Sequence, residues 1–140
     1  MSHVSKIELE IKDLNSLIAA CKHIGLTFIK NQKSYKWYGR IVNPDLHPLP
    51  EGVTRKDLGN CDHAIQIPEA NYEIGVIFRN GKYLLLCDFW DRGVEKKIGK
   101  NGGKIKQAYA IAQIIAQARK KHLKVSENSI ENGIRLILKK

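Results

Sequence analysis

The sequence predicts an α+β fold in which an antiparallel β-sheet is covered on one face by two α-helices. Several short segments alternate apolar and polar side chains, as half-buried strands do. Two longer segments instead place apolar residues at helical spacing. The chain has 140 residues, of which 43% are hydrophobic and 27% charged. This length and composition are typical of one globular domain, which we expect to span residues 1–140.

The N-terminal segment predicts a strand followed by a helix. Residues 5–12, SKIELEIK, alternate apolar and charged side chains. Asp13 follows in a position to cap a helix over residues 14–24, because its carboxylate can accept hydrogen bonds from backbone amides at the helix start. Gly25 ends the helix, since glycine adopts the left-handed backbone that helix ends favour.

The middle of the chain predicts short strands separated by a long loop. Residues 26–30 and 34–42 are each expected to form a strand. Residues 43–60 contain three of the four prolines and are expected to form a loop that is long for a small domain. A further strand is expected over residues 64–68.

A β-hairpin is the clearest local signal. Residues 72–79 and 82–89 are rich in apolar and aromatic side chains and surround Asn80-Gly81. Both of these central residues tolerate positive φ, as the favoured two-residue hairpin turns require.

The C-terminal part predicts the second helix and two more strands. A glycine-rich stretch at residues 99–103 precedes an amphipathic helix over 104–123. Strands at 123–126 and 133–139 are expected to follow, with a turn between them. Because each helix leads into a strand and a turn, the element order also suggests a βαββ duplication.

Four stretches resemble an uncharacterised protein family that occurs in cyanobacteria and as an open reading frame in algal plastids. They are Met1-Ser2-His3 before the first strand, Tyr72-Glu73-Ile74-Gly75 before the hairpin, Gln107-Ala108-Tyr109-Ala110 in the second helix, and Gly133-Ile134-Arg135-Leu136 near the C-terminus. The chain departs from the family in its longer loop over 43–60 and its lysine-rich stretch over 96–104. The resemblance implies an α+β fold, and it supplies no catalytic residues.

Positive charge is concentrated in one segment. Between Arg92 and Lys124 there are ten Lys and Arg residues and one acid, Glu95, which gives this segment +9 of the total formal charge of +10. Such a concentration creates a local field that attracts anions. Cations at the start of a helix oppose its dipole unless an anion binds there. We therefore expect phosphate contacts from Lys96, Lys97, Lys100, Lys104 and Lys106.

A second basic stretch, KSYKWYGR, covers residues 33–40. Lys36, Trp37 and Arg40 are expected to form a secondary binding surface, because aromatic rings stack on bases while cations hold phosphate. The alternative is that Tyr35 and Trp37 are buried against a helix as core residues, since a sheet needs aromatic filling. The sequence leaves both alternatives open.

The stretch NCDHAI contains residue types that bind metals or act in catalysis. Cys61 and His63 would share a strand face, but a structural zinc needs four ligands and no further pair has suitable spacing. Cys21 and Cys87 lie in apolar segments and are expected in the core. Asp88, Asp91 and Glu95 are expected at a solvated strand end, and GKNGGK lacks the Ser or Thr that a P-loop requires after its lysine. No metal, cofactor or catalytic residue is therefore expected.

These observations predict a non-catalytic binding module for an anionic partner, namely RNA, DNA or a ribonucleoprotein. One alternative is an assembly subunit with an acidic protein partner, which would use loop 43–60 and an uncovered sheet face. Another is a binder of a small anionic, nucleotide-like ligand at residues 99–103. No apolar run is long enough to span a membrane, and the N-terminus lacks the apolar block of a signal peptide. A location in the cytoplasm or an organelle stroma is therefore expected.

Overall fold

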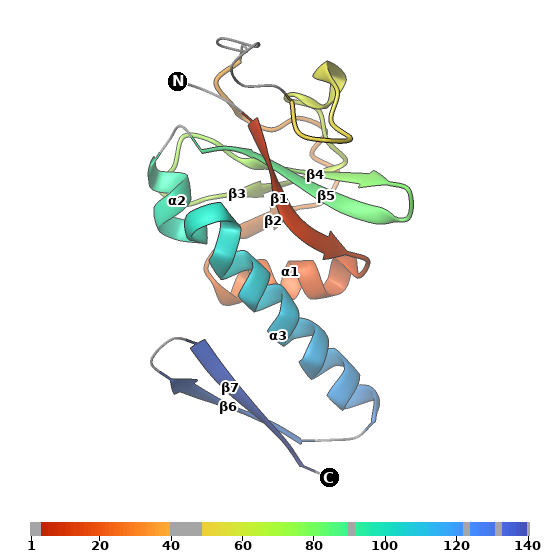
Figure 1. The fold of residues 1–140 in the computed structure, drawn as a ribbon, viewed down its shortest axis with the longest axis vertical. Coiled ribbons are helices and arrows are strands. Elements are labelled where there is room, and N and C mark those ends of the chain that lie inside the picture. The colour runs from red at the N-terminus through yellow and green to blue at the C-terminus, as the bar shows by residue number, and fades with distance from the viewer. Residues whose placement is uncertain (1–3, 40–48, 90–91, 122–123, 131–132, 140) are drawn as a thin grey trace.

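The computed structural model describes residues 4–39, 49–89, 92–121, 124–130 and 133–139, and it has an α+β fold (Figure 1). The strands are β1 (Val4–Ile11), β2 (Thr27–Ile29), β3 (His63–Gln66), β4 (Ile74–Arg79), β5 (Lys82–Asp88), β6 (Lys124–Ile130) and β7 (Gly133–Lys139). The helices are α1 (Leu14–His23), α2 (Arg92–Ile98) and α3 (Gly103–Lys120), with short 3₁₀ turns η1 (Arg55–Asp57) and η2 (Lys100–Gly102).

Five strands form one antiparallel sheet in the order β1-β5-β4-β3-β2. The predicted fold class is confirmed. The β4–β5 hairpin turns at Asn80 and Gly81, which have φ values of 54° and 78°, as the Asn-Gly pair predicts. β6 and β7 pair with each other outside this sheet. In the suggested duplication they would correspond to the strands after α1, but β2 and β3 belong to the five-stranded sheet, so the two halves are not arranged alike.

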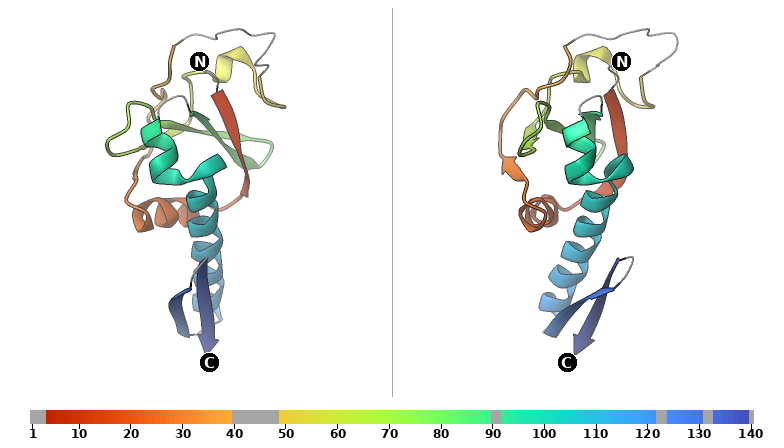
Figure 2. Two further views of the ribbon diagram at one scale, coloured as in Figure 1. Left: turned by 60° about the vertical axis from the view of Figure 1, so that its left-hand side comes forward. Right: turned by 90° about the vertical axis from the view of Figure 1, so that its left-hand side faces the viewer.

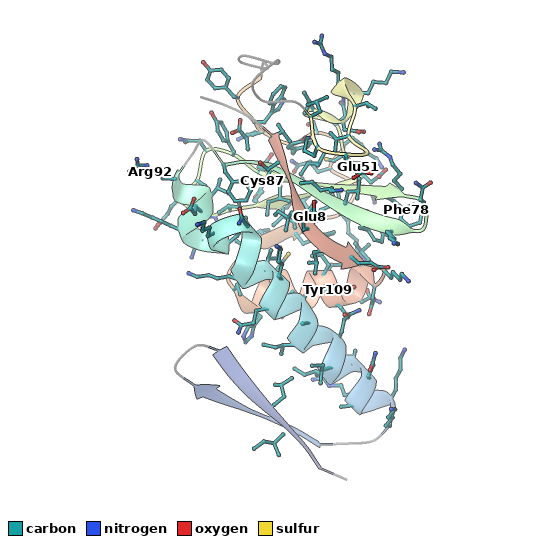
Figure 3. The ribbon with its side chains drawn as sticks, viewed as in Figure 1. Glu8, Glu51, Phe78, Cys87, Arg92 and Tyr109 are labelled. Atoms are coloured by element: carbon teal, nitrogen blue, oxygen red, sulfur yellow. The ribbon has the colours of Figure 1, made fainter. Side chains whose placement is uncertain are left out.

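The main hydrophobic core lies between one face of the sheet and the helices (Figures 1 and 2). Tyr109 of α3 is 1% exposed and lies where α3 passes the end of β1 (Figure 3). Its hydroxyl accepts hydrogen bonds from the backbone N–H groups of Lys12 and Asp13 at 3.2 and 3.3 Å. Asp13 in turn caps α1, since its Oδ1 accepts from the Asn15 N–H at 3.0 Å. These contacts join the β1–α1 connection to α3.

The other face of the sheet is also covered, which corrects the expectation of an uncovered face. A second cluster of buried residues contains Tyr35, Val53, Ala64, Ile77 and Leu86. Two of these, Tyr35 and Val53, come from the irregular segments 34–38 and 49–61, which lie on the side opposite α1 and α3 (Figure 1). The described part of the predicted loop, residues 49–60, therefore packs on the sheet, while residues 43–48 lie outside the described part of the chain.

An ion pair anchors that covering segment to the sheet. Arg79 of β4 donates two hydrogen bonds to the carboxylate of Asp57, of 2.6 and 3.0 Å. The Arg79 guanidinium lowers the pKa of Asp57, and the same carboxylate also accepts from the Thr54 N–H at the start of η1. A bidentate pair of this kind fixes direction as well as distance.

Three local predictions were wrong. The strand expected over 34–42 is absent from its described part, where Ser34 forms an isolated bridge with Asn60; residues 40–42 are outside the described chain. The short helix α2 was not predicted, although it lies within the basic segment. β6 runs to Ile130, so the turn before β7 is shorter than expected.

Gly75 of β4 provides a test of the packing on the second face. A Cβ added there would overlap the ring of buried Tyr35. Gly75→Ala is therefore expected to lower the free energy of unfolding by about 1–3 kcal/mol, as overpacked cores do. Urea unfolding measures this change in the free energy of unfolding.

Gly103→Ala is the matched control for this substitution. An added Cβ meets no atom within 4 Å there, and Gly103 has a helical φ of −55°. The control should raise stability by up to about 1 kcal/mol, because alanine favours the helix. Equal stabilities for the two variants would contradict the packing assigned to Tyr35.

Candidate functional site

The reactive side chains of NCDHAI hold neighbouring backbone segments in place. The Cys61 thiol donates to the Gln32 carbonyl at 3.1 Å. Asp62 Oδ2 accepts from the Phe78 N–H at 2.7 Å, and His63 Nδ1 accepts from the Asn31 N–H at 3.0 Å. These three side chains thus connect β3 to β4 and to the turn after β2.

The cysteines are poorly suited to nucleophilic chemistry. Burial raises the pKa of the Cys61 thiol to about 11 and that of the Cys21 thiol to about 12, so both stay protonated near neutral pH. Cys87 is fully buried, and none of the three cysteines forms a disulfide. Within the described residues, no cluster of three or more His, Cys, Asp or Glu side chains could hold a metal ion.

The predicted phosphate contacts, at residues 96–106 of the basic segment, lie in α2, η2 and the first turn of α3. Lys96, Lys100 and Lys104 are exposed, and Lys97 and Lys106 are half-buried. Arg92 begins α2 and points away from the fold (Figure 3). Together with Glu95, the side chains of Arg92, Lys96 and Lys100 line a hollow of about 490 Å³, which is called the basic hollow below.

Arg92 was counted in the basic segment but was missing from the predicted contacts. Its spacing of four residues from Lys96 was the available signal, because residues four apart share a helix face and both lie in α2.

Two lysines of the segment also have structural contacts. Lys104 Nζ donates to the Lys96 carbonyl at 3.2 Å, near the C-terminal end of α2. Lys97 reaches toward α1, and a Cβ built on Gly25 would lie 3.9 Å from Lys97 Nζ. Because a cation near a helix C-terminus is favourable, both lysines contribute to local structure as well as to surface charge.

The glycines before α3 have packing roles. A Cβ on Gly102 would come within 2.8 Å of Ile7 Cγ2, so Gly102 allows η2 to lie directly on β1. A Cβ on Gly99 would lie 3.1 Å from the Lys104 backbone nitrogen, which places Gly99 beside the start of α3. Gly99 and Gly102 have φ values of 81° and 75°, which other residues rarely adopt.

The basic hollow is one of three neighbouring hollows on the surface. Lys96 also lines a second hollow of about 410 Å³, together with Lys97, Gly93, Pro68 and Glu69. Pro68 then lines a third hollow of about 280 Å³, which includes Lys36. Shared lining residues thus place Lys36 of the second basic stretch in a series of neighbouring hollows with Lys96 of the first.

The structure separates the residues of the second predicted surface. Lys36 is exposed and lines the third hollow. Trp37 is half-buried in the second cluster, and a Cβ on Gly59 would lie 2.8 Å from its Nε1. Tyr35 is buried, with its hydroxyl donating to the Asp57 carbonyl at 2.7 Å. Arg40 and Trp90 lie outside the described residues.

Glu95 is the acid in the lining of the basic hollow, and it forms no ion pair with a described lysine or arginine. Among the described residues there are four ion pairs, and their cations are Lys6, Lys12, Arg79 and Lys82. None belongs to residues 92–106. Asp88, expected at a solvated strand end, is fully buried and accepts from the Tyr38 N–H at 3.2 Å.

Comparison of the chain with models of protein families, with functionally described proteins and with solved structures found no match. In the part of the chain that the structure describes, no helix is both long enough and apolar enough to cross a membrane.

The hydrogen bond between the Asn31 N–H and His63 depends on pH. Partial burial lowers the pKa of His63, and its Nδ1 must be unprotonated to accept from Asn31. Its contribution to stability is therefore complete above about pH 6.5 and is lost as the pH falls toward the lowered pKa.

We expect His63→Asn to remove this dependence. The stability difference from the wild type, measured by urea unfolding, should be larger at about pH 7.5 than at about pH 5.5. His23→Gln, at an exposed position of α1, is the control and should keep the wild-type pH profile. A constant difference for His63→Asn at both pH values would contradict this role.

Proposed function

We propose that this protein is a non-catalytic binding module for nucleic acid, either alone or within a ribonucleoprotein, and that α2, η2 and the start of α3 form its interface. The observation that carries the proposal is the group of Arg92, Lys96 and Lys100 around one hollow. These side chains have no acidic partner in an ion pair among the described residues.

Electrostatics favours an anionic ligand at this position. The first turn of α3 contains no acid, and the Gly102 N-cap provides no side-chain hydrogen bond to the helix start. Positive charge near this end opposes the helix dipole, at a cost of about 0.3–1 kcal/mol for each exposed cation. A bound phosphate group would reverse that cost, because lysine and arginine then pair with it directly.

The shape of the surface favours an extended ligand over a small one. Lys96 lines the basic hollow and the second hollow, and Pro68 lines the second and the third, so the three hollows neighbour one another from Lys100 of η2 past α2 to Lys36. A polyanion could contact cations along this series of hollows. By contrast, the backbone at Gly99 and Gly102 lies close to Lys104 and Ile7, so these glycines are explained by packing within the fold without a nucleotide. The sheet face considered for an acidic protein partner is covered.

The proposal predicts that neutral substitutions at the interface weaken binding. A variant with Lys96→Gln, Lys100→Gln and Lys104→Gln should bind single-stranded RNA at least about tenfold more weakly at low salt. A plot of log affinity against log salt concentration should also have a shallower slope, because about two to three fewer counterions are released. Each lost phosphate contact removes about 0.7 from that slope. Fluorescence anisotropy at several salt concentrations measures both quantities.

The control carries the same change in net charge at the other end of α3. Arg119→Gln, Lys120→Gln and Lys121→Gln also remove three positive charges, and these side chains are exposed. This variant should keep most of the affinity. Equal losses in the two variants would show that only overall charge matters, and an absence of salt-dependent binding by the wild type would overturn the proposal.

A further inference from the structure

The third hollow has a buried acid in its lining. It lies beside the β2 edge of the sheet, has a volume of about 280 Å³, and is lined by Thr27, Lys36, Gln66, Ile67, Pro68, Ala70, Asn71, Tyr72 and Glu73. It thus combines a cation and a carboxylate with an aromatic ring and short apolar side chains. This composition differs from that of the basic hollow, whose lining is mostly cationic.

Glu73 is the unusual member of this lining. It is 7% exposed, and its Oε1 accepts hydrogen bonds from the Lys36 N–H at 3.0 Å and from Gln32 Nε2 at 3.1 Å. Its other oxygen, Oε2, has no protein partner among the described residues. A buried carboxylate oxygen without a donor costs free energy. A ligand that brings an N–H group into the hollow would supply that donor.

The position of the hollow identifies the kind of donor. It shares Pro68 with the second hollow, which in turn shares Lys96 with the basic hollow, so it neighbours the surface where phosphate contacts are proposed. The carboxylate repels phosphate, whereas the amino groups of nucleobases are hydrogen-bond donors to acids. A base pair uses one hydrogen of such an amino group and keeps the base stacked inside the duplex, whereas an unstacked base of a single strand can enter a hollow. The volume also accommodates one base.

We propose that this hollow binds one nucleobase of a single-stranded nucleic acid through an exocyclic amino group, which donates to Glu73 Oε2. The phosphates of the same strand contact Lys96 and Lys100. This inference rests on the proposed function and extends it to a class of substrate, a single strand with an amino-bearing base at this position.

The matched substitution is Glu73→Gln. The amide oxygen of the introduced glutamine can keep both protein hydrogen bonds, while its Nε2 replaces the acceptor at Oε2 with a donor of similar size. Binding is measured by fluorescence anisotropy with labelled oligocytidine and oligouridine RNAs of about 12 nucleotides, within the usual range of single-strand site sizes. The two bases are similar in size and differ at position 4, which carries an amino group in cytosine and a carbonyl group in uracil.

The wild type should bind oligocytidine about tenfold more tightly than oligouridine, and Glu73→Gln should abolish or reverse this preference. A second measurement uses the wild-type protein and an oligocytidine in which both N4 hydrogens are replaced by methyl groups. This RNA should bind no more tightly than oligouridine. Thermal unfolding checks that the variant is folded.

Each outcome decides a separate point. Salt-dependent binding without a preference for cytosine, or with an unchanged preference after N4 methylation, overturns the base site and leaves the proposed function standing. An absence of binding to either RNA overturns the proposed function itself.

Discussion

One buried carboxylate holds residues 32–38 over the sheet, and the third hollow depends on the path of that segment. Glu73 accepts from the Lys36 N–H and from Gln32, while its own N–H donates to the Lys36 carbonyl at 2.9 Å. Tyr35, next to Lys36, is thereby directed into the second cluster over Gly75. The Lys36 side chain is left at the third hollow. One acid thus connects the packing of the second face with the shape of the surface.

The elements that the sequence predicted correctly are those whose signals are local. Alternation identified the segment of β1, the Asn80-Gly81 turn identified those of β4 and β5, and helical spacing identified α1 and α3. α2 was missed because it has seven residues, with Val94 and Ile98 as its buried contacts. The segment after Ser34 shows real alternation, since Tyr35 is buried and Lys36 exposed. Its backbone, however, bonds to the Glu73 and Asp88 carboxylates where a neighbouring strand was expected.

The candidate site likewise contains residues that local sequence patterns reveal and residues that they do not. The basic residues are close together along the chain, so the sequence alone reveals their concentration, and Arg92 needed only the four-residue spacing of a helix face. The third hollow had no such local signal in the sequence, because Glu73 is separated from Lys36 and Gln32 by 37 and 41 residues. Contacts at that range depend on how the chain crosses the sheet. Local patterns do not specify such a crossing.

The acid among the cations has a physical consequence for how a strand would lie. A path lined by cations alone attracts phosphates anywhere along its length, and so it provides affinity without register. A carboxylate at one point repels phosphate there and admits a group that donates hydrogen bonds. Phosphates would then contact Arg92, Lys96 and Lys100, while a base would turn toward Glu73. Because Glu73 also holds the backbone at Lys36, the group that would set this register is fixed by the fold itself.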